Sequence, residues 1–144
     1  MKYELIKSDV SDIERLIKYK KNTIYEYADD LSDEEITRIN NYVENNVPKL
    51  LDNYSNIVVD GKVVGCLLVT LENDGVLLDE IFIDEEFRNK GIGTSIINNI
   101  LNNNDIVYLW VYKKNVKAIA LYKRLSFNVV SETDSRYYMK YEKQ

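Results

Sequence analysis

Residues 76–112 carry the feature that most constrains the fold of this 144-residue chain. An apolar segment, Val76–Ile83, leads into Arg88-Asn89-Lys90-Gly91-Ile92-Gly93-Thr94, and a helical pattern follows from Gly93 to Leu101. The next apolar segment, Ile106–Tyr112, has no polar face, as is typical of a central strand covered on both sides. The order strand, glycine-containing turn, helix and strand predicts a right-handed crossover between two parallel strands.

The rest of the chain extends this unit into one α/β domain, a mixed (α+β) sheet of about six to seven strands flanked by helices. Asp60-Gly61 between two apolar runs is a strong hairpin signal. No linker, repeat or low-complexity tract divides residues 1–144. Further strands are expected at residues 3–6, 56–59, 62–71, 127–131 and 136–141, and a last helix at residues 115–125.

Two helices are expected before the first hairpin. An apolar stripe predicts the first of them, and Ser32 followed by Glu35 forms a capping box for the second. Pro48 is expected to kink or break the second helix near residues 45–47. The residues of the stripe are Val10, Ile13, Ile17, Ile24 and Tyr27.

The chain contains no histidine, which excludes Ser-His-Asp and Cys-His nucleophile systems and histidine-bound zinc. A hard-cation site built from carboxylates is the remaining alternative, but no calcium-loop spacing occurs and the chemistry needs no metal, so none is expected. Cys66, the one cysteine, lies in an apolar run and is expected to be a buried small hydrophobe. No apolar run approaches the roughly 20 residues of a membrane-spanning helix, and the first residues lack a signal-peptide core. A cytoplasmic protein without a membrane partner is therefore expected.

Charge is distributed unevenly along the chain. Residues 87–128 contain seven basic residues and one acidic residue, a net charge of +6 within a chain of net charge −5. A cationic region in an acidic protein suits a small polyanion such as coenzyme A, whereas the acidic remainder would repel a nucleic acid. Six acids and no base lie within residues 26–35, which predicts either a solvated helix junction or an acidic rim that attracts a cationic amine.

The turn before residue 93 has the chemistry of a phosphate site. Backbone N–H groups at the start of a helix have no helical partner, and glycines allow phosphate oxygens to approach them closely. Arg88 and Lys90 add full positive charges. A tight turn without a ligand is the alternative, and the Gly-x-Gly-x-x-Gly dinucleotide fingerprint is absent.

The stretch Ile81–Gly93 closely resembles the acetyl-CoA motif of the GNAT superfamily of N-acetyltransferases. Leu109-Trp110-Val111 resembles the second motif of that family, together with the downstream residues Asn115, Ala118, Leu121, Tyr122, Leu125 and Phe127. The resemblance covers about residues 57–142 and implies an acyl-CoA-binding core at residues 55–144, with residues 1–54 as a helical substrate-side region. Ser126 departs from the family, which usually has glycine there.

The resemblance also implies where acetyl-CoA binds as co-substrate. The expected opening is V-shaped and lies between strands 76–83 and 106–112, with pantetheine on the backbone of the first strand, pyrophosphate on the amides from Lys90 to Thr94, and Asn115 against the cofactor arm. The implied cofactor-binding residues are Phe82, Ile83, Arg88, Asn89, Lys90, Gly91, Ile92, Gly93, Thr94 and Asn115.

Direct transfer to an amine requires a base, an oxyanion donor and an acid for the departing thiolate. Tyr122, which matches the tyrosine of the family, is the candidate acid, because a phenol keeps its proton at neutral pH. Asp79 and Glu80 interrupt an apolar strand, and Glu80 is preferred over Asp79 as base, with an ordered water as the alternative to both. Neighbouring strand residues face opposite sides, so only one acid should reach the cleft unless a bulge intervenes.

These residues predict an N-acetyltransferase that acts on a primary amine of a small molecule or peptide. A noncatalytic acyl-CoA sensor or assembly module and a nucleotide-binding regulatory domain are the alternatives. No motif identifies the acceptor, and a homodimer is one option for a domain of this kind.

Overall fold

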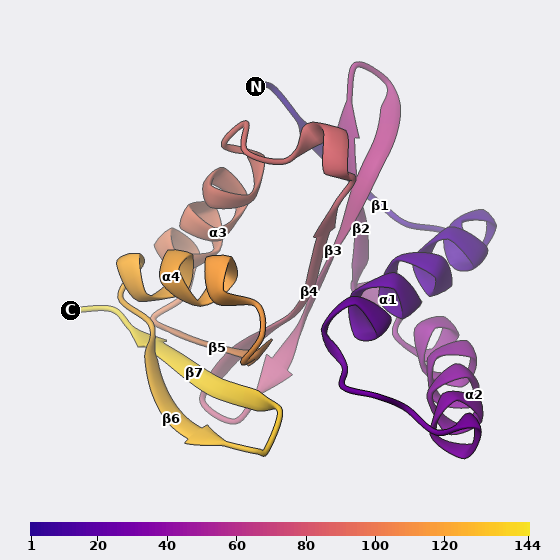
Figure 1. The fold of residues 1–144 in the computed structure, drawn as a ribbon. Helices are drawn as coiled ribbons and strands as arrows, with labels where there is room; N and C mark the ends of the chain where they lie inside the picture. Colours follow the sequence, from indigo (N-terminus) through magenta and orange to yellow (C-terminus); the bar gives the residue numbers. More distant parts are fainter.

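The computed structural model describes residues 1–144. They form one seven-stranded mixed sheet with helices on both of its faces (Figure 1). This architecture confirms the predicted fold class. Three short 3₁₀ helices occur at Val10–Asp12, Leu51–Asn53 and Glu85–Phe87. The strands and α-helices are β1 (Glu4–Lys7), α1 (Ile13–Tyr27), α2 (Asp33–Lys49), β2 (Tyr54–Val59), β3 (Lys62–Glu72), β4 (Gly75–Ile83), α3 (Ile92–Asn103), β5 (Ile106–Tyr112), α4 (Val116–Arg124), β6 (Asn128–Glu132) and β7 (Arg136–Glu142).

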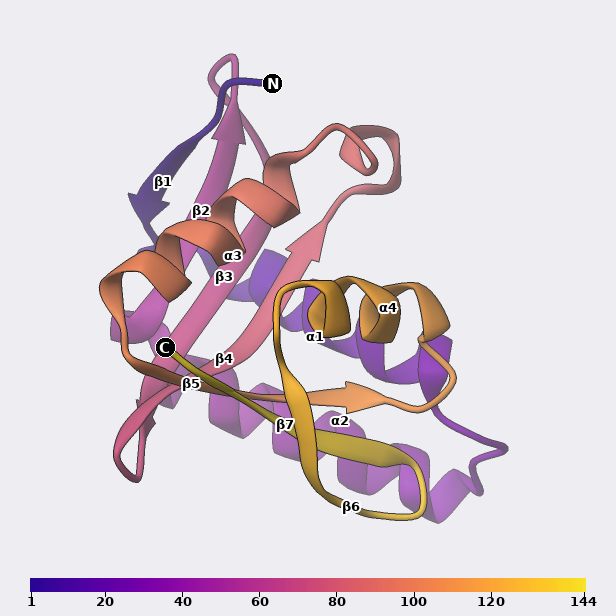
Figure 2. The ribbon, with the colours of Figure 1, turned by 90° about the vertical axis from the view of Figure 1, so that its left-hand side faces the viewer.

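The strand order is β1-β2-β3-β4-β5-β7-β6, and β4 and β5 form the one parallel pair. These two strands pair at three positions only, from Val76 opposite Val107 to Leu78 opposite Leu109. Beyond Leu78 they separate, and Figure 2 shows β4 and β5 running apart beneath α3 and α4. The backbone of β4 from residue 79 onward therefore has no partner strand on its β5 side.

Two apolar clusters hold the helices against the sheet. Helices α3 and α4 cover one face, where fifteen buried residues pack together, and α1 and α2 cover the other face of β1–β4 with a cluster of seven (Figure 1). Cys66 belongs to the second cluster and is fully buried, as predicted. No helix is both long and apolar enough to cross a membrane.

The apolar stripe predicted for the first helix is partly wrong. Val10 is 74% exposed and lies in a 3₁₀ turn capped by Asp9, and the residues of α1 that are buried are Leu16 and Tyr19. The α-helix begins only at Ile13, so Val10 lies before it and is not part of its buried face. Ile17 and Ile24 do pack against this cluster, but they are only partly buried.

Local signals at the turns and caps were more reliable. The Ser32–Glu35 capping box is present, and Asp60-Gly61 makes a hairpin turn with φ values of 49° and 77°. Of the kink or break predicted near residues 45–47, the break is wrong, because α2 continues to Lys49. Pro48 lies in the last turn of α2, where its missing N–H removes only one helical hydrogen bond. Ser126 takes the left-handed conformation that glycine would favour, with φ of 74°.

Candidate functional site

The turn from β4 into α3 exposes backbone donors. Gly91 is the N-cap of α3 with φ of 86°, and Asn89 is also left-handed with φ of 60°. The first helical hydrogen bond runs from the Ser95 N–H to the Gly91 carbonyl at 3.0 Å. The N–H groups of residues 92–94 therefore precede the hydrogen-bonded part of the helix and are free for an anion.

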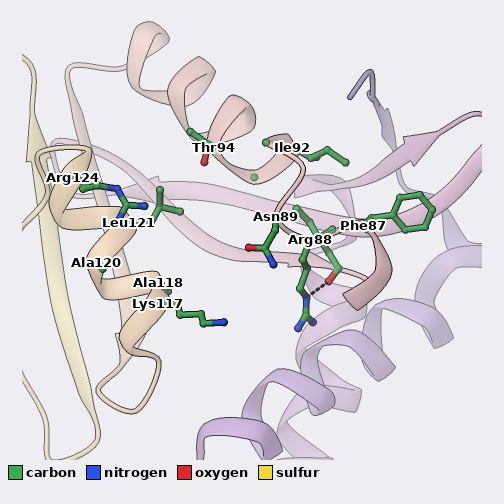
Figure 3. A pocket seen from close by; sticks show the side chains of 13 residues that line it. Phe87, Arg88, Asn89, Ile92, Thr94, Lys117, Ala118, Ala120, Leu121 and Arg124 are labelled. Atoms are coloured by element: carbon green, nitrogen blue, oxygen red, sulfur yellow. Dashed lines mark hydrogen bonds between the residues drawn. The ribbon is translucent and has the colours of Figure 1, made fainter.

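A cavity of about 460 Å³ adjoins this turn, between the start of α3 and one side of α4 (Figure 3). Three basic side chains line it: Arg88 from the turn, and Lys117 and Arg124 from α4. Lys90 was also predicted to add positive charge to this site, but it is exposed and does not line the cavity. The remaining lining residues are Ile83, Phe87, Asn89, Gly91, Ile92, Gly93, Thr94, Ala118, Ala120 and Leu121.

Lys117 and Arg124 were counted in the cationic region of the sequence but were not assigned to the site. They lie seven residues apart, with Leu121 between them, so all three share one helical face. That spacing was the signal that could have found them. Together with Arg88 and the free amides, they make this cavity suited to a polyanion such as a diphosphate.

A second cavity of about 600 Å³ continues from the first along β4 and shares Ile83, Arg88, Asn89 and Lys117 with it. Phe82, Ile83 and Asn115 line this cavity, in keeping with their predicted place beside an extended ligand. The Arg88 Nε–H donates to the Ile83 carbonyl at 2.7 Å, which fixes the side chain across the strand end (Figure 3). Asn115 Oδ1 accepts from the Ala118 N–H at 3.3 Å and so caps α4.

A β-bulge in β4 changes which sides of the sheet Asp79 and Glu80 face. Val69 of β3 pairs with Leu78 and Leu68 pairs with Glu80, so Asp79 has no partner across the ladder. The extra residue reverses the inside–outside alternation. Leu78 accordingly packs with the cluster beneath α3 and α4, whereas Glu80 lies on the face covered by α1 and α2.

Because of this bulge, Asp79 and Glu80 line the same third cavity, which has a volume of about 260 Å³ and also includes Tyr122. This cavity shares Thr23, Tyr27, Ile81 and Asn115 with the second one. The three cavities therefore adjoin, from the start of α3 to the acids of β4. The other lining residues are Lys20, Ile24, Tyr42, Leu78, Trp110, Val111, Tyr112 and Arg136.

Glu80 is only 8% exposed, and three side chains contact its carboxylate. The Tyr54 hydroxyl donates to Glu80 Oε1 at 2.7 Å, the Cys66 thiol donates to Oε2 at 3.4 Å, and Lys20 Nζ lies 3.8 Å from Oε1. Burial raises the pKa of Glu80, and the positive charge of Lys20 and the two hydrogen bonds oppose that rise. Burial also raises the pKa of the Cys66 thiol well above its usual range, so it stays protonated.

Tyr122 comes from α4 and is buried, with its ring edge-on to Phe127 at a centroid separation of 5.7 Å. Burial, and to a lesser degree Tyr27, raises the pKa of Tyr122 to about 12. The phenol is therefore protonated at neutral pH and able to donate. Lys20, Tyr54 and Arg136 were missed from sequence, because only the fold brings α1, β2 and β7 to Glu80 and its cavity.

No three His, Cys, Asp or Glu side chains lie close enough together to hold a metal ion.

The seven-stranded mixed sheet with its flanking helices is a fold that solved acetyltransferase structures share. A PaiA N-acetyltransferase from Thermoplasma acidophilum, solved in complex with coenzyme A, superposes with a TM-score of 0.75 at 19% identity, and the match covers 99% of both chains. An acetyltransferase from Thermus thermophilus gives a TM-score of 0.73 at 17% identity, over 99% of this chain and 97% of the other.

Sequence comparison identifies the family. The profile described as Acetyltransferase (GNAT) family matches residues 14–127, and the chain belongs to that family. An uncharacterized N-acetyltransferase of Methanocaldococcus jannaschii is 46% identical over 55 residues, or 35% of this chain and 24% of the relative. A spermine/spermidine N(1)-acetyltransferase of Bacillus subtilis is 32% identical over 69 residues, or 44% of this chain and 45% of the relative. The matches thus span less than half the length of these curated relatives.

Proposed function

We propose that this protein is an N-acetyltransferase that transfers the acetyl group of acetyl-CoA to a primary amine by direct attack. The observation that carries the proposal is the continuity of the three cavities, which join the free amides of α3 to Tyr122 and Glu80. Membership of the GNAT family supports the same reaction. The noncatalytic alternative would not need a carboxylate and a phenol in one cavity.

The first and second cavities would hold acetyl-CoA. The amides of residues 92–94, with Arg88, Lys117 and Arg124, offer the pyrophosphate hydrogen bonds and positive charge. The β5 side of β4 near Phe82 and Ile83, which lacks a partner strand, would bind the amide groups of pantetheine, and Asn115 would contact the same arm. The core at residues 55–144 supplies all of these contacts.

The third cavity would hold the acceptor, and residues 1–54 would form its outer side. Helices α1 and α2 contribute Lys20, Thr23, Ile24, Tyr27 and Tyr42 to its lining. The polyamine acetyltransferase among the relatives makes a cationic small molecule one candidate acceptor, and a peptide amine is another. Both present an ammonium that a carboxylate can receive.

Glu80 would remove a proton from the acceptor ammonium, directly or through water. This step matters because an alkylamine with a pKa near 10.4 is only about 0.04% neutral at pH 7. The neutral nitrogen then attacks the thioester carbonyl carbon and forms the C–N bond, while a backbone N–H near Phe82 or Ile83 stabilises the oxyanion. The oxyanion re-forms the carbonyl as the C–S bond breaks, and the thiolate takes a proton from the Tyr122 hydroxyl. The attacking nitrogen, which is cationic after C–N bond formation, loses its remaining extra proton, and that proton restores the Tyr122 hydroxyl through water.

Two measurements on the purified protein test this proposal. Acetyl-CoA at 100 times its dissociation constant should stabilise the fold by about 2.7 kcal/mol in thermal melts. Thiol release should then follow addition of an acceptor from a screen of polyamines, amino acids, aminoglycosides and peptide N-termini. Stabilisation without thiol release for any amine would contradict the enzyme and favour the sensor, and the absence of both would contradict the cofactor site.

A further inference from the structure

Four charged side chains line the third cavity: Lys20, Asp79, Glu80 and Arg136. Two of them satisfy one another, because Lys20 Nζ lies 3.8 Å from Glu80 Oε1. Asp79 and Arg136 form no ion pair with any protein side chain within 4.0 Å. The cavity therefore offers a ligand one free carboxylate and one free guanidinium.

The guanidinium of Arg136 is held in place without being neutralised. Arg136 is the first residue of β7, opposite Tyr112 of β5, and its guanidinium carbon lies 4.6 Å from the ring centroid of Trp110. Stacking uses the flat face of the guanidinium and leaves its N–H edge available. Its side chain makes no hydrogen bond in the structure, and the acids of the adjoining cavity, Asp29, Asp30 and Glu35, all stay beyond ion-pair distance.

A planar guanidinium fixed on an aromatic ring is a receptor for a carboxylate, because two parallel N–H groups match its two oxygens. The same group repels a second ammonium. A polyamine that placed one nitrogen at Glu80 would bring another positive charge toward Arg136, whereas a carboxylate there would be attracted. The charge pattern of the cavity is thus complementary to a zwitterion and not to a polycation.

We propose that the acceptor is a small zwitterionic amine, with its ammonium on the Asp79–Glu80 side of the third cavity and its carboxylate on Arg136. This inference rests on the proposed function for the identity of the reacting group. A volume of about 260 Å³ favours a small acceptor, since pockets for drug-sized ligands measure roughly 300–1,000 Å³. Arg136 and Trp110 are then specificity-determining residues, and neither touches the reacting atoms.

The test compares amino acids with the amines that differ from them only by loss of the carboxylate: lysine with cadaverine, ornithine with putrescine, and tyrosine with tyramine. Spermidine is added as the polycation. Thiol release gives kcat/KM for each, and the best amino acid should exceed its decarboxylated partner by at least about tenfold. In Arg136→Gln the preference should disappear through a higher KM for the amino acid, and Arg136→Lys should restore part of it.

Lys140→Gln is the matched control. Lys140 also lies on β7 and over an aromatic ring, 5.5 Å from the centroid of Tyr108, but it pairs with Glu142 and lies outside the cavity. The preference should survive this change. A wild-type protein that favours the decarboxylated amines or spermidine, or a preference unchanged in Arg136→Gln, would overturn the inference.

A binding measurement separates this inference from the proposed function. Trp110 is the one tryptophan of the chain, so intrinsic fluorescence reports directly on the Arg136 subsite. In the protein saturated with coenzyme A, amino acids should cause a saturable change that is absent for their decarboxylated partners and absent in Arg136→Gln. A fluorescence response without thiol release supports the carboxylate subsite and refutes the enzyme. Thiol release from decarboxylated amines, with no fluorescence response to amino acids, supports the enzyme and refutes the carboxylate subsite.

Discussion

The hydroxyl of Tyr54 donates a hydrogen bond of 2.7 Å to Oε1 of Glu80, and both side chains are almost completely buried. The bond links β2 to the bulged part of β4 on the face covered by α1 and α2. A buried carboxylate is costly unless it is hydrogen-bonded. The pair therefore fixes the orientation of Glu80 and stabilises its ionised form.

Replacing Tyr54 by Phe should move the acid limb of kcat/KM to higher pH. The hydrogen bond lowers the pKa of Glu80, so its loss raises that pKa further. A base works only when unprotonated, so kcat/KM of the variant would rise at a higher pH than that of the wild type. Tyr25→Phe is the control, because it removes a hydroxyl that bonds Asn40 away from the cavity. An acid limb that does not move would separate Glu80 from proton removal.

Replacing Lys20 by Met should move the same limb in the same direction and further. Among the groups that lower the pKa of Glu80, the positive charge of Lys20 has the largest effect. Lys21→Met serves as control, since the neighbouring lysine pairs with Glu44 on α2 and does not line the cavity. The pH dependence of kcat/KM measures both variants, and a shift toward lower pH in Lys20→Met would exclude Glu80 as the titrating group.

Glu80→Gln and Asp79→Asn should separate the two acids. If Glu80 is the base, Glu80→Gln lowers kcat by about 10²–10⁴-fold and removes the acid limb. Asp79→Asn should mainly raise KM, because Asp79 is exposed in the bulge and can attract the acceptor ammonium without moving its proton. Small effects on kcat in both variants would assign proton removal to water.

Much of the fold was predictable because it depends on local signals that survive tertiary packing. Asp60-Gly61 adopts the positive φ values of a hairpin turn, and the Ser32 capping box forms as its spacing predicts. Val10 shows the limit of local patterns, because it was assigned to the buried face of a helix that begins only at Ile13, and it is exposed. Pro48 shows the opposite error, since α2 continues past it to Lys49 although a break was one predicted outcome.

The site was predictable only where one segment of chain builds it. Gly91 and its neighbours form the predicted turn because a strand and a helix flank them directly in sequence. The bulge at Asp79 depends on how β3 pairs with β4, and no residue of β4 reveals it alone. Tyr54 reaches Glu80, and Arg136 reaches the third cavity, from strands far apart in the sequence, so their places follow from the sheet order.

Tyr122→Phe should lower kcat with little change in acetyl-CoA affinity. The phenol, with its pKa raised to about 12, retains its proton at neutral pH and can protonate the thiolate. The ring itself packs on Phe127 and is kept in the variant, so the fold should be unaffected. Single-turnover thiol release and a thermal-shift titration with acetyl-CoA measure the two quantities separately. Unchanged turnover would remove Tyr122 from the mechanism.

Gly91→Asp should weaken acetyl-CoA binding in a folded protein, and Gly61→Asp should not. Both glycines have positive φ, of 86° and 77°, and an added Cβ at either position meets no atom within 4 Å. The backbone strain of the two variants should therefore be similar, on the order of 1–2 kcal/mol. Only the carboxylate at residue 91 would face the anion-binding end of α3, where we expect the dissociation constant to rise at least about tenfold, or about 1.4 kcal/mol. Isothermal titration with acetyl-CoA compares them, and equal affinities would place the diphosphate elsewhere.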